Sequence, residues 1–325
     1  MTANGRTDGS HPLGEMKIFS GTAGTDLTRR ICDYLKITPG RALIDRFPDG
    51  ETLIKLDDDV RGKDCFVLQP TCPPVNDNLM QLLIFIDSLR RASASRITAV
   101  IPYYGYARQD RKSEGRTPIT AKLVANMIVE AGAHRVLAMN LHADQIQGFF
   151  DIPLDHLSSA PVIAEHFREL HLQNIAVVSP DVGNIKTANE YGQRLGGELA
   201  VIDKRRVASD STVAVNIIGN VEDKTVLIFD DMITTGGTVA EAVKLLKQHR
   251  CGPVYVAATH PIFAGPCVQR LSSVPIEQIC VTDTVPLSPE VTSRLKNIQV
   301  LSVANLMGEA IRRIHDHRSV SALFM

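Results

Sequence analysis

The 325-residue sequence contains no tryptophan, and only 5% of its residues are aromatic. It has no apolar run long enough to cross a bilayer, so we expect no transmembrane helix and no membrane partner. Residues 1–15 lack the basic and then apolar pattern of a signal peptide, and we expect them to form a disordered N-terminal tail. A GxxxxGK[ST] segment is also missing, which argues against a P-loop kinase.

An excess of charge of one sign is missing as well. The 35 basic and 36 acidic residues leave a net charge of -1, so no overall field attracts the protein to nucleic acid. We therefore expect no nucleic-acid partner, and any bound anion must be held by a local cluster of charges.

Six cysteines are present, but none forms a CxxC pair, and most lie among apolar neighbours. This usage favours buried thiols in a reducing cytoplasm over a disulfide framework. The cysteines are Cys32, Cys65, Cys72, Cys251, Cys267 and Cys280.

Residues 226–238, with the sequence VLIFDDMITTGGT, are the most informative segment. Residues 226–229 form a continuous apolar run, which is typical of a central strand in a parallel sheet covered on both faces. Asp230 and Asp231 follow at the carboxyl end of this strand, where open α/β sheets bind their ligands. The apolar spacing in 239–249 then predicts a helix.

The loop between this strand and helix suits a phosphate group. Its glycines allow backbone N–H groups to approach an anion, and the positive end of the helix dipole favours negative charge. The acidic pair would repel a phosphate, so the part of the ligand beside it should offer donors, such as the hydroxyls of a sugar. The inferred ligand is a sugar phosphate. The alternative is an acidic turn before an ordinary helix N-terminus. The loop consists of Thr234, Thr235, Gly236, Gly237 and Thr238.

Three further segments carry polar side chains at the ends of predicted strands. Arg108 and Gln109 follow three tyrosines in 103–112, which suits a nucleotide base and polyphosphate, although a solvated basic loop is an equal alternative. His142 and Asp181 each stand just beyond a strand end, where Asp181 could meet a divalent cation or a sugar.

The segment 203–206 reads DKRR and contains three consecutive cations. Like charges repel each other unless an anion is near, so a bound anion would explain them. A plain electrostatic patch is the alternative.

Strands and helices alternate along the chain, which predicts an α/β fold with two similar halves. Strands are expected at 16–20, 42–44, 64–69, 97–102, 136–140, 175–178, 199–202, 226–229, 254–259, 276–281 and 299–302. Helices are expected at 26–35, 79–92, 117–131, 162–170, 239–249 and 306–317, with another around Ala188 and Tyr191.

Together these segments resemble the ribose-phosphate diphosphokinase (PRPP synthetase) family, bacterial type. FPDGE, TCPPVNDNLM, RITAVIPYYGYARQDRK, LHADQIQGFFDIP, VVSPDVGN, IDKRR, DDMITTGGT, ATHPIF and EAIRRIH occur in the family's order, and the resemblance runs from about Met16 to Phe324.

The resemblance implies a transferase that moves the diphosphoryl group of ATP to O1 of ribose 5-phosphate. The products are PRPP and AMP, and PRPP feeds the biosynthesis of nucleotides, histidine and tryptophan. It also implies Mg²⁺ as cofactor, a cytoplasmic homohexamer, and inorganic phosphate and ADP as effectors.

The implied fold is two tandem phosphoribosyltransferase type I-like domains, each a mainly parallel sheet flanked by helices. The expected bounds are 16–153 for the ATP side and 154–311 for the ribose 5-phosphate side. Residues 312–325 are expected to pack back on the first domain.

Site residues carry over by matching position. The resemblance assigns catalysis to Lys204 and Arg206, and metal binding to His142 and Asp181. ATP would contact Phe47, Asp49, Gly50, Glu51, Arg108 and Gln109, with the hairpin residues coming from a neighbouring subunit. Ribose 5-phosphate would contact Arg206, Asp230, Asp231, Thr234, Thr235, Gly236, Gly237 and Thr238.

The sequence departs from the family at several positions. Thr234 stands where a third acidic residue is usual, so we expect altered ribose affinity. Asn184 replaces a common glycine, and Asn140 replaces a frequent aspartate. Residues 113–116 differ near the regulatory site of many members, which leaves allosteric control open. A phosphoribosyltransferase that consumes PRPP, or an inactive regulatory homologue, remains the alternative function.

Overall fold

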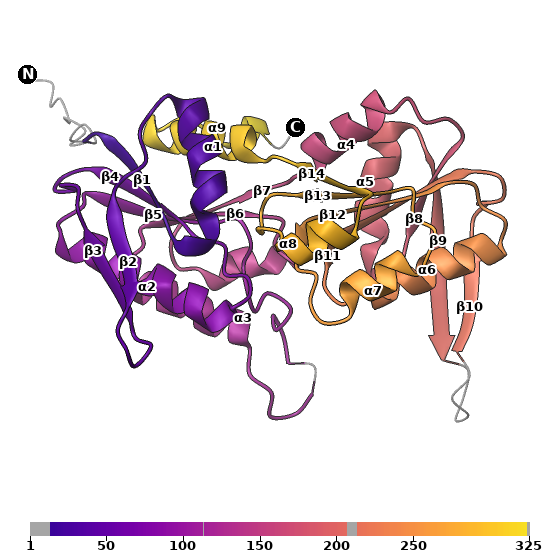
Figure 1. Ribbon diagram of the computed structural model, residues 1–325, viewed down its shortest axis with the longest axis horizontal. Coiled ribbons are helices and arrows are strands. Elements are labelled where there is room, and N and C mark those ends of the chain that lie inside the picture. The colour runs from indigo at the N-terminus through magenta and orange to yellow at the C-terminus, as the bar shows by residue number, and fades with distance from the viewer. Residues whose placement is uncertain (1–13, 113, 207–212, 324–325) are drawn as a thin grey trace, which may run out of the picture.

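Two mainly parallel β-sheets, each covered by helices on both faces, lie side by side along the long axis of the molecule (Figure 1). The computed structural model describes residues 14–112, 114–206 and 213–323, with only the backbone of residues 182, 204–206 and 213–215. The expected N-terminal tail, apart from residues 14 and 15, lies outside the described residues. Among these residues, no helix combines the length and the apolar character that a membrane crossing requires.

The first sheet has the strand order β1-β4-β5-β6-β7, with all neighbours parallel. The helices α2 and α3 cover one face and α1 covers the other. The elements are β1 (Met16–Ser20), α1 (Thr25–Leu35), β4 (Asp64–Leu68), α2 (Val75–Arg91), β5 (Arg96–Ile101), α3 (Thr120–Ala131), β6 (Arg135–Met139) and β7 (Leu154–Leu157).

An antiparallel hairpin projects from this sheet's outer end. It is formed by β2 (Ala42–Arg46) and β3 (Thr52–Leu56), and its turn is closed by a hydrogen bond from Phe47 N to Glu51 O (2.8 Å). Gly50 sits in this turn with a φ of 96°, a conformation that glycine adopts without strain.

The second sheet has the order β10-β9-β8-β11-β12-β13-β14, in which only β10 runs antiparallel to its neighbour. Its strands are β8 (Ile175–Ser179), β9 (Glu198–Arg206), β10 (Val213–Ile218), β11 (Thr225–Ile233), β12 (Val254–Pro261), β13 (Gln278–Thr282) and β14 (Ile298–Leu301). The expectation that residues 226–229 form a central strand is confirmed, because β11 lies in the middle of this order.

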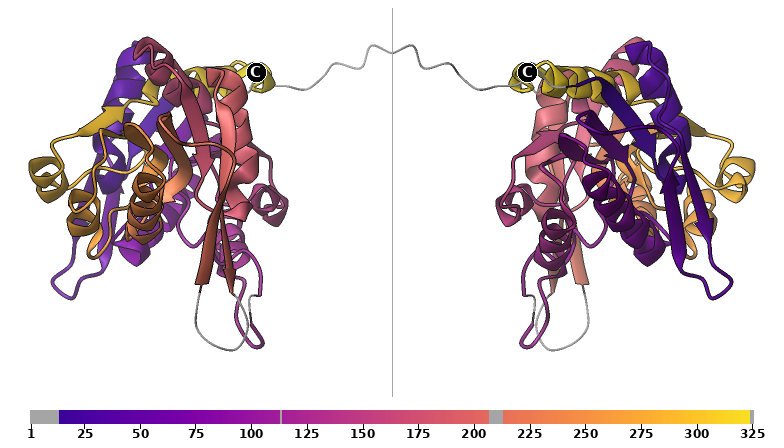
Figure 2. Two further views of the ribbon diagram at one scale, coloured as in Figure 1. Left: turned by 90° about the vertical axis from the view of Figure 1, so that its right-hand side faces the viewer. Right: turned by 90° about the vertical axis from the view of Figure 1, so that its left-hand side faces the viewer.

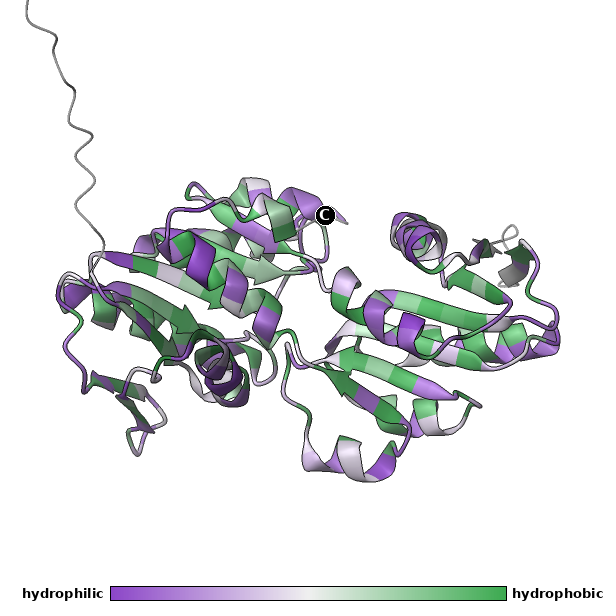
Figure 3. Ribbon diagram, turned by 90° about the horizontal axis from the view of Figure 1, so that it is seen from above, coloured by the Kyte–Doolittle hydropathy of each residue, from purple (hydrophilic) through white to green (hydrophobic). Residues whose placement is uncertain are grey.

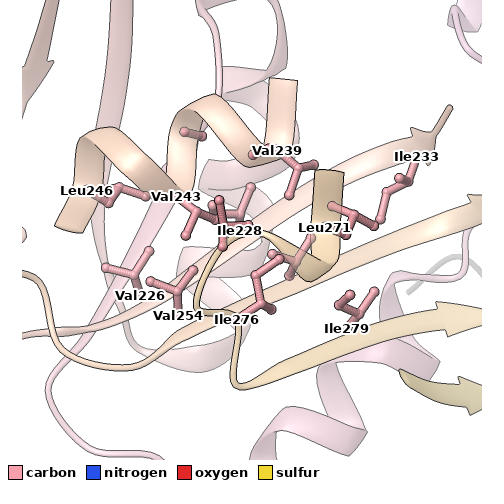
Figure 4. Packing of buried hydrophobic residues seen from close by; sticks show 14 of the residues in the cluster. Val226, Ile228, Ile233, Val239, Val243, Leu246, Val254, Leu271, Ile276 and Ile279 are labelled. Atoms are coloured by element: carbon pink, nitrogen blue, oxygen red, sulfur yellow. The ribbon is translucent and has the colours of Figure 1, made fainter. Parts of the chain in front are cut away.

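The apolar run of β11 serves two cores because alternate side chains point to opposite faces. Val226 and Ile228 pack against α6 (Gly237–Gln248) and α7 (Cys267–Ser272), as Figure 4 shows. Leu227 and Phe229 pack on the other face against α4 (Ala160–Glu169) and α5 (Ile185–Leu195). Figure 3 shows the same division, with apolar strands between helices of mixed polarity.

The last long helix, α9 (Ala304–His315), returns from the second sheet to the first and lies beside α1. A fully buried carboxylate, Asp64, anchors it. Arg96 donates to both oxygens of Asp64 (2.8 and 2.6 Å) and to the carbonyl of Ile314 (2.9 Å), while His315 Nδ1 lies 2.8 Å from Asp64 Oδ2. The first sheet is therefore completed by a segment from the far end of the chain.

The two sheets meet through a small apolar cluster and a buried histidine. Tyr103 from the first half and Met232 from the second belong to this cluster, and the Tyr103 ring lies 5.0 Å from the ring of His260. His260 Nε2 donates to the carbonyl of Asn140 (3.0 Å), and burial lowers the pKa of His260 to about 4. A neutral imidazole therefore joins the ends of β6 and β12.

Two contacts bear on where the first sheet ends and where the chain returns to it. β7 pairs with β6, so the first sheet extends to Leu157, and the return contact on the first sheet begins at Val303. The domain bounds 16–153, 154–311 and 312–325 stay a prediction.

Candidate functional site

A cavity of about 190 Å³ opens at the carboxyl ends of the strands where the two halves meet. Both halves contribute polar side chains to it. Its lining includes Arg108, His142, Asp181, Asp230, Asp231 and the whole loop from Thr234 to Thr238. Residues predicted from four separate segments of the sequence therefore face one space.

The loop after β11 packs against α7, which contacts it through Arg270 and Cys267. Arg270 of α7 donates to the carbonyl of Thr235 (3.1 Å), and a Cβ on Gly236 would lie only 3.1 Å from Cys267 Sγ. Gly236 also has a φ of 71°, which most side chains would strain. A larger residue at this position would therefore distort the loop that begins α6.

The two adjacent carboxylates differ in their electrostatics. Burial and the neighbouring charge of Asp231 raise the pKa of Asp230 well above its usual value. Burial also acts to raise the pKa of Asp231, but the hydrogen bond and charge of His142 outweigh it and hold that pKa below the usual value. Asp231 therefore carries the firm negative charge of the pair.

A hydrogen bond joins His142 and Asp231 across the two halves. Asp231 Oδ2 lies 2.6 Å from His142 Nδ1, and this hydrogen bond raises the pKa of His142. In the neutral imidazole, donation through Nδ1 leaves the lone pair of Nε2 free for another ligand. The sequence predicted both residues, but it did not predict that they would contact each other.

Asp181 begins the short turn after β8. Its Oδ1 accepts a hydrogen bond from the backbone N–H of Asn184 (3.0 Å), and the Asn184 side chain donates to the carbonyl of Phe229 (2.6 Å). A Cβ on Gly183 would lie 3.2 Å from Asp181 Oδ1, so glycine leaves room for this carboxylate.

A second cavity, of about 610 Å³, adjoins the first. It shares His142, Asp181, Asp230 and Asp231 with the smaller cavity and continues along α5 as far as Tyr191. The acidic residues and His142 therefore stand between two connected spaces, one of which contains the glycine loop.

The segment after β5 is partly as expected. Arg108 is exposed and lines the smaller cavity, and Gln109 accepts a hydrogen bond from the Thr120 hydroxyl (2.5 Å) through its Oε1. The expectation that the tyrosines offer flat surfaces to a base is wrong for Tyr103 and Tyr104, which are only 7% and 2% exposed. They pack in the interior because they follow directly from a buried strand.

The predicted hairpin residues do not line either cavity. Phe47, Asp49, Gly50 and Glu51 occupy the exposed turn between β2 and β3, and Phe47 keeps 47% of its surface exposed. Within one chain they are separate from the other predicted ATP contacts, whereas the resemblance draws them from a neighbouring subunit.

The side chains of Lys204 and Arg206 lie outside the described residues. Their backbone extends β9, with Lys204 opposite Val215 and Arg206 opposite Val213 in β10. The strand expected at 199–202 is therefore longer than predicted. Figure 2 shows that the strands β9 and β10 extend in the same direction as the segment between β5 and α3.

No group of three or more His, Cys, Asp or Glu side chains is arranged to hold a metal ion within the described parts of the chain. His142 and Asp181, the predicted metal ligands, line the same two cavities as Asp230 and Asp231. The carboxylates fit Mg²⁺, which usually keeps several waters and uses one or two protein carboxylates together with substrate phosphates, whereas the imidazole of His142 is a less usual ligand for this hard cation.

Sequence reasoning missed the supporting contacts of three residues at the site. Arg270 braces the glycine loop, His260 joins the two halves, and the side chain of Asn184 binds β11. ATHPIF marked the region of His260, but no local pattern indicated what these side chains contact.

Comparison with known proteins covers both halves of the chain. Residues 16–132 match the family described as the N-terminal domain of ribose phosphate pyrophosphokinase, and residues 205–325 match the phosphoribosyl synthetase-associated domain.

A ribose-phosphate pyrophosphokinase from Rhodopirellula baltica is 55% identical over 313 residues, which cover 95% of this chain and 98% of that protein. The protein of the same name from Nostoc sp. is 49% identical over 324 residues, covering 99% of this chain and 96% of the other. The crystal structure of phosphoribosylpyrophosphate synthetase from Mycobacterium smegmatis matches with a TM-score of 0.89 and 39% identity, over 94% of this chain and 100% of that chain.

Proposed function

This chain belongs to the ribose-phosphate pyrophosphokinase family, and on that premise we propose that the site described above joins ATP to ribose 5-phosphate. The activity is the synthesis of PRPP, by transfer of the diphosphoryl group of ATP to O1 of ribose 5-phosphate with release of AMP. The observation that carries the proposal is the single cavity lined by Arg108 and His142 from the first half and by Asp181, Asp230 and the glycine loop from the second.

The second half holds the pentose. The loop from Thr234 to Thr238 binds the 5-phosphate, because it opens the twelve-residue helix α6 with a glycine-rich turn. Asp230 accepts hydrogen bonds from the ribose hydroxyls. Asp231, which contacts His142, orients that imidazole and reaches the ribose less directly than the resemblance implies.

The first half holds the nucleotide. Arg108 and Gln109 contact ATP, and Phe47, Asp49, Gly50 and Glu51 complete the adenine site of a neighbouring subunit in a homohexamer. The exposed position of the hairpin turn supports this arrangement, because these side chains are available to another copy.

Mg²⁺ would be held by His142 Nε2 and Asp181 together with the phosphates, and it would neutralise charge that builds on the transferring group. The residues of this chain keep O1 of the ribose in line with the β-phosphorus. Lys204 and Arg206, on β9, add positive charge as oxygens of the diphosphoryl group and of the leaving AMP become more negative. Arg206 also reaches the ribose 5-phosphate.

The setting of the enzyme is cytoplasmic, with inorganic phosphate and ADP as effectors. All six cysteines are free and buried, which supports a reducing compartment. An inactive regulatory homologue is a weaker alternative, because the relatives that match over almost the whole chain are named as pyrophosphokinases.

The experiment is to follow AMP release from ATP with ribose 5-phosphate and Mg²⁺, with and without inorganic phosphate. We expect AMP and PRPP in equal amounts. A parallel reaction with PRPP and a free base tests the phosphoribosyltransferase alternative. Consumption of PRPP there, without AMP release in the first reaction, would overturn the proposal.

A further inference from the structure

The strand that carries the acidic pair, β11, loses its pairing with β8 immediately before the site, while its pairing with β12 continues. The pairing of β8 with β11 ends where Val178 lies opposite Ile228. One step further along a parallel ladder, residue 180 would donate its N–H to the carbonyl of Phe229. Residue 180 is proline, which has no N–H to donate.

The side chain of Asn184 replaces the missing donor. Its Nδ2 donates to the Phe229 carbonyl at 2.6 Å, in a partly buried setting. Phe229 immediately precedes Asp230, so this bond fixes the backbone at the point where the strand delivers its carboxylates. A glycine at position 184 could not make the bond.

The backbone of Asn184 serves the other side of the site. Its N–H donates to Asp181 Oδ1 at 3.0 Å, and Asn184 lines the larger cavity together with Asp181 and Asp230. One residue therefore contacts both the turn that carries Asp181 and the strand that carries Asp230.

We propose that Asn184 is a positioning residue that locks the turn of Asp181 to the end of β11 and so sets the spacing between the metal-binding and ribose-binding carboxylates. This inference rests on the proposed function, because it assumes that Asp181 binds the metal and Asp230 the ribose. Without the side-chain bond, the Phe229 carbonyl is left without this donor, and the turn can move relative to the strand. Residues that orient metal ligands typically contribute about 10-fold to 100-fold in metal affinity or activity.

The test is Mn²⁺ binding to full-length protein, measured by electron paramagnetic resonance. Ribose 5-phosphate and an ATP analogue with a methylene group between the α and β phosphorus atoms are present, so no turnover occurs. We expect Asn184→Ala to weaken Mn²⁺ binding about tenfold or more. It should raise the Mg²⁺ concentration for half-maximal activity by a similar factor.

Asn297→Ala is the matched control. Asn297 Nδ2 donates to the carbonyl of Ile276 at 2.7 Å, also in a partly buried setting of the second sheet, but Asn297 lines neither cavity. We expect its Mn²⁺ affinity to equal that of the wild type. Thermal unfolding of both variants shows whether a change in affinity merely follows a loss of stability.

A folded Asn184→Ala protein with wild-type Mn²⁺ affinity would overturn the inference, whatever its turnover. If that variant does not fold, Gly183→Ala serves instead, since its Cβ would press on Asp181 Oδ1 and should weaken Mn²⁺ binding without touching the Asn184 bond to Phe229. Unchanged affinity there would show that the position of Asp181 is irrelevant to the metal. Failure of the wild type to release AMP would instead refute the proposed function.

Discussion

The two halves bring opposite chemistry to the same edge. The first sheet contributes Arg108 and the imidazole of His142, whereas the second contributes Asp181, the acidic pair and the glycine loop. Both place these groups at the carboxyl ends of parallel strands. A cationic side thus faces an acidic one, which is what two substrates with different needs, a polyphosphate and a sugar, require. The similar architecture of the two halves places the polar side chains at the carboxyl ends of the strands. The identity of the residues in the following loops determines which ligand each half binds.

The largest effect is expected where the second half must supply positive charge of its own. Lys204→Ala should reduce turnover by roughly 10² to 10³, by analogy with the loss of one preorganised donor to developing charge. The hexamer should remain intact by size-exclusion chromatography. Lys244→Ala, which removes an exposed cation from α6, is the control and should leave turnover unchanged. Equal rates in the two variants would remove Lys204 from the mechanism.

The contact between the halves provides the next test. Asp231→Asn removes the charge that orients His142, and we expect about a 10-fold to 100-fold loss in kcat/KM with a higher Mg²⁺ requirement. Asp223→Asn removes an exposed carboxylate from a distant turn of the same half and should change neither value. If Asp231 acted only on ribose, KM for ribose 5-phosphate would rise while the Mg²⁺ requirement stayed constant.

Two arginine variants should separate the halves by substrate. Arg108→Ala should raise KM for ATP about tenfold, because a charge-assisted hydrogen bond contributes about 1.5–3 kcal/mol. Arg270→Ala should instead raise KM for ribose 5-phosphate, because it loosens the loop at the Thr235 carbonyl. Arg294→Ala, on an exposed ion pair of α8 (Pro289–Arg294), is the control for both. If Arg108→Ala and Arg270→Ala changed the KM values for ATP and ribose 5-phosphate equally, the assignment of one substrate to each half would be contradicted.

The smallest effect should be on stability alone. His315→Ala removes one of the contacts of Asp64 but leaves Arg96 in place, so the free energy of unfolding should fall by about 1 kcal/mol. Turnover should not change. Chemical denaturation measures the difference, with the exposed His249→Ala as reference. A loss of activity without a loss of stability would show that α9 influences the site directly.

Much of this arrangement was predictable from strong periodic patterns. The uninterrupted apolar run of β11 and the end of the helix expected at 117–131 both appear as expected, and this helix ends where Gly132 adopts the left-handed conformation. The edge strands β7 and β10 were not predicted. β7 has only four residues and no continuous apolar run. It forms a strand because its backbone pairs in parallel with β6.

The site was predictable in its members but not in their contacts. Spacing and order placed His142 and Asp231 near strand ends, yet they are 89 positions apart in the sequence, and only the meeting of the two sheets brings them together. For the tyrosines, the prediction was wrong about exposure to a ligand. Their pattern is that of a binding surface, but Tyr103 and Tyr104 are buried in the interior. The local sequence does not indicate this packing.

The position of α9 has a consequence for synthesis on the ribosome. The upper face of the first sheet is built from Ile18, Phe66 and their neighbours, and α9 covers it although the whole second sheet is translated in between. The nascent first half therefore emerges with this apolar face covered by α1 alone, and about 150 further residues must be added after β7 before α9 is available. A chaperone that shields this face during elongation would have its strongest influence on the yield of soluble protein.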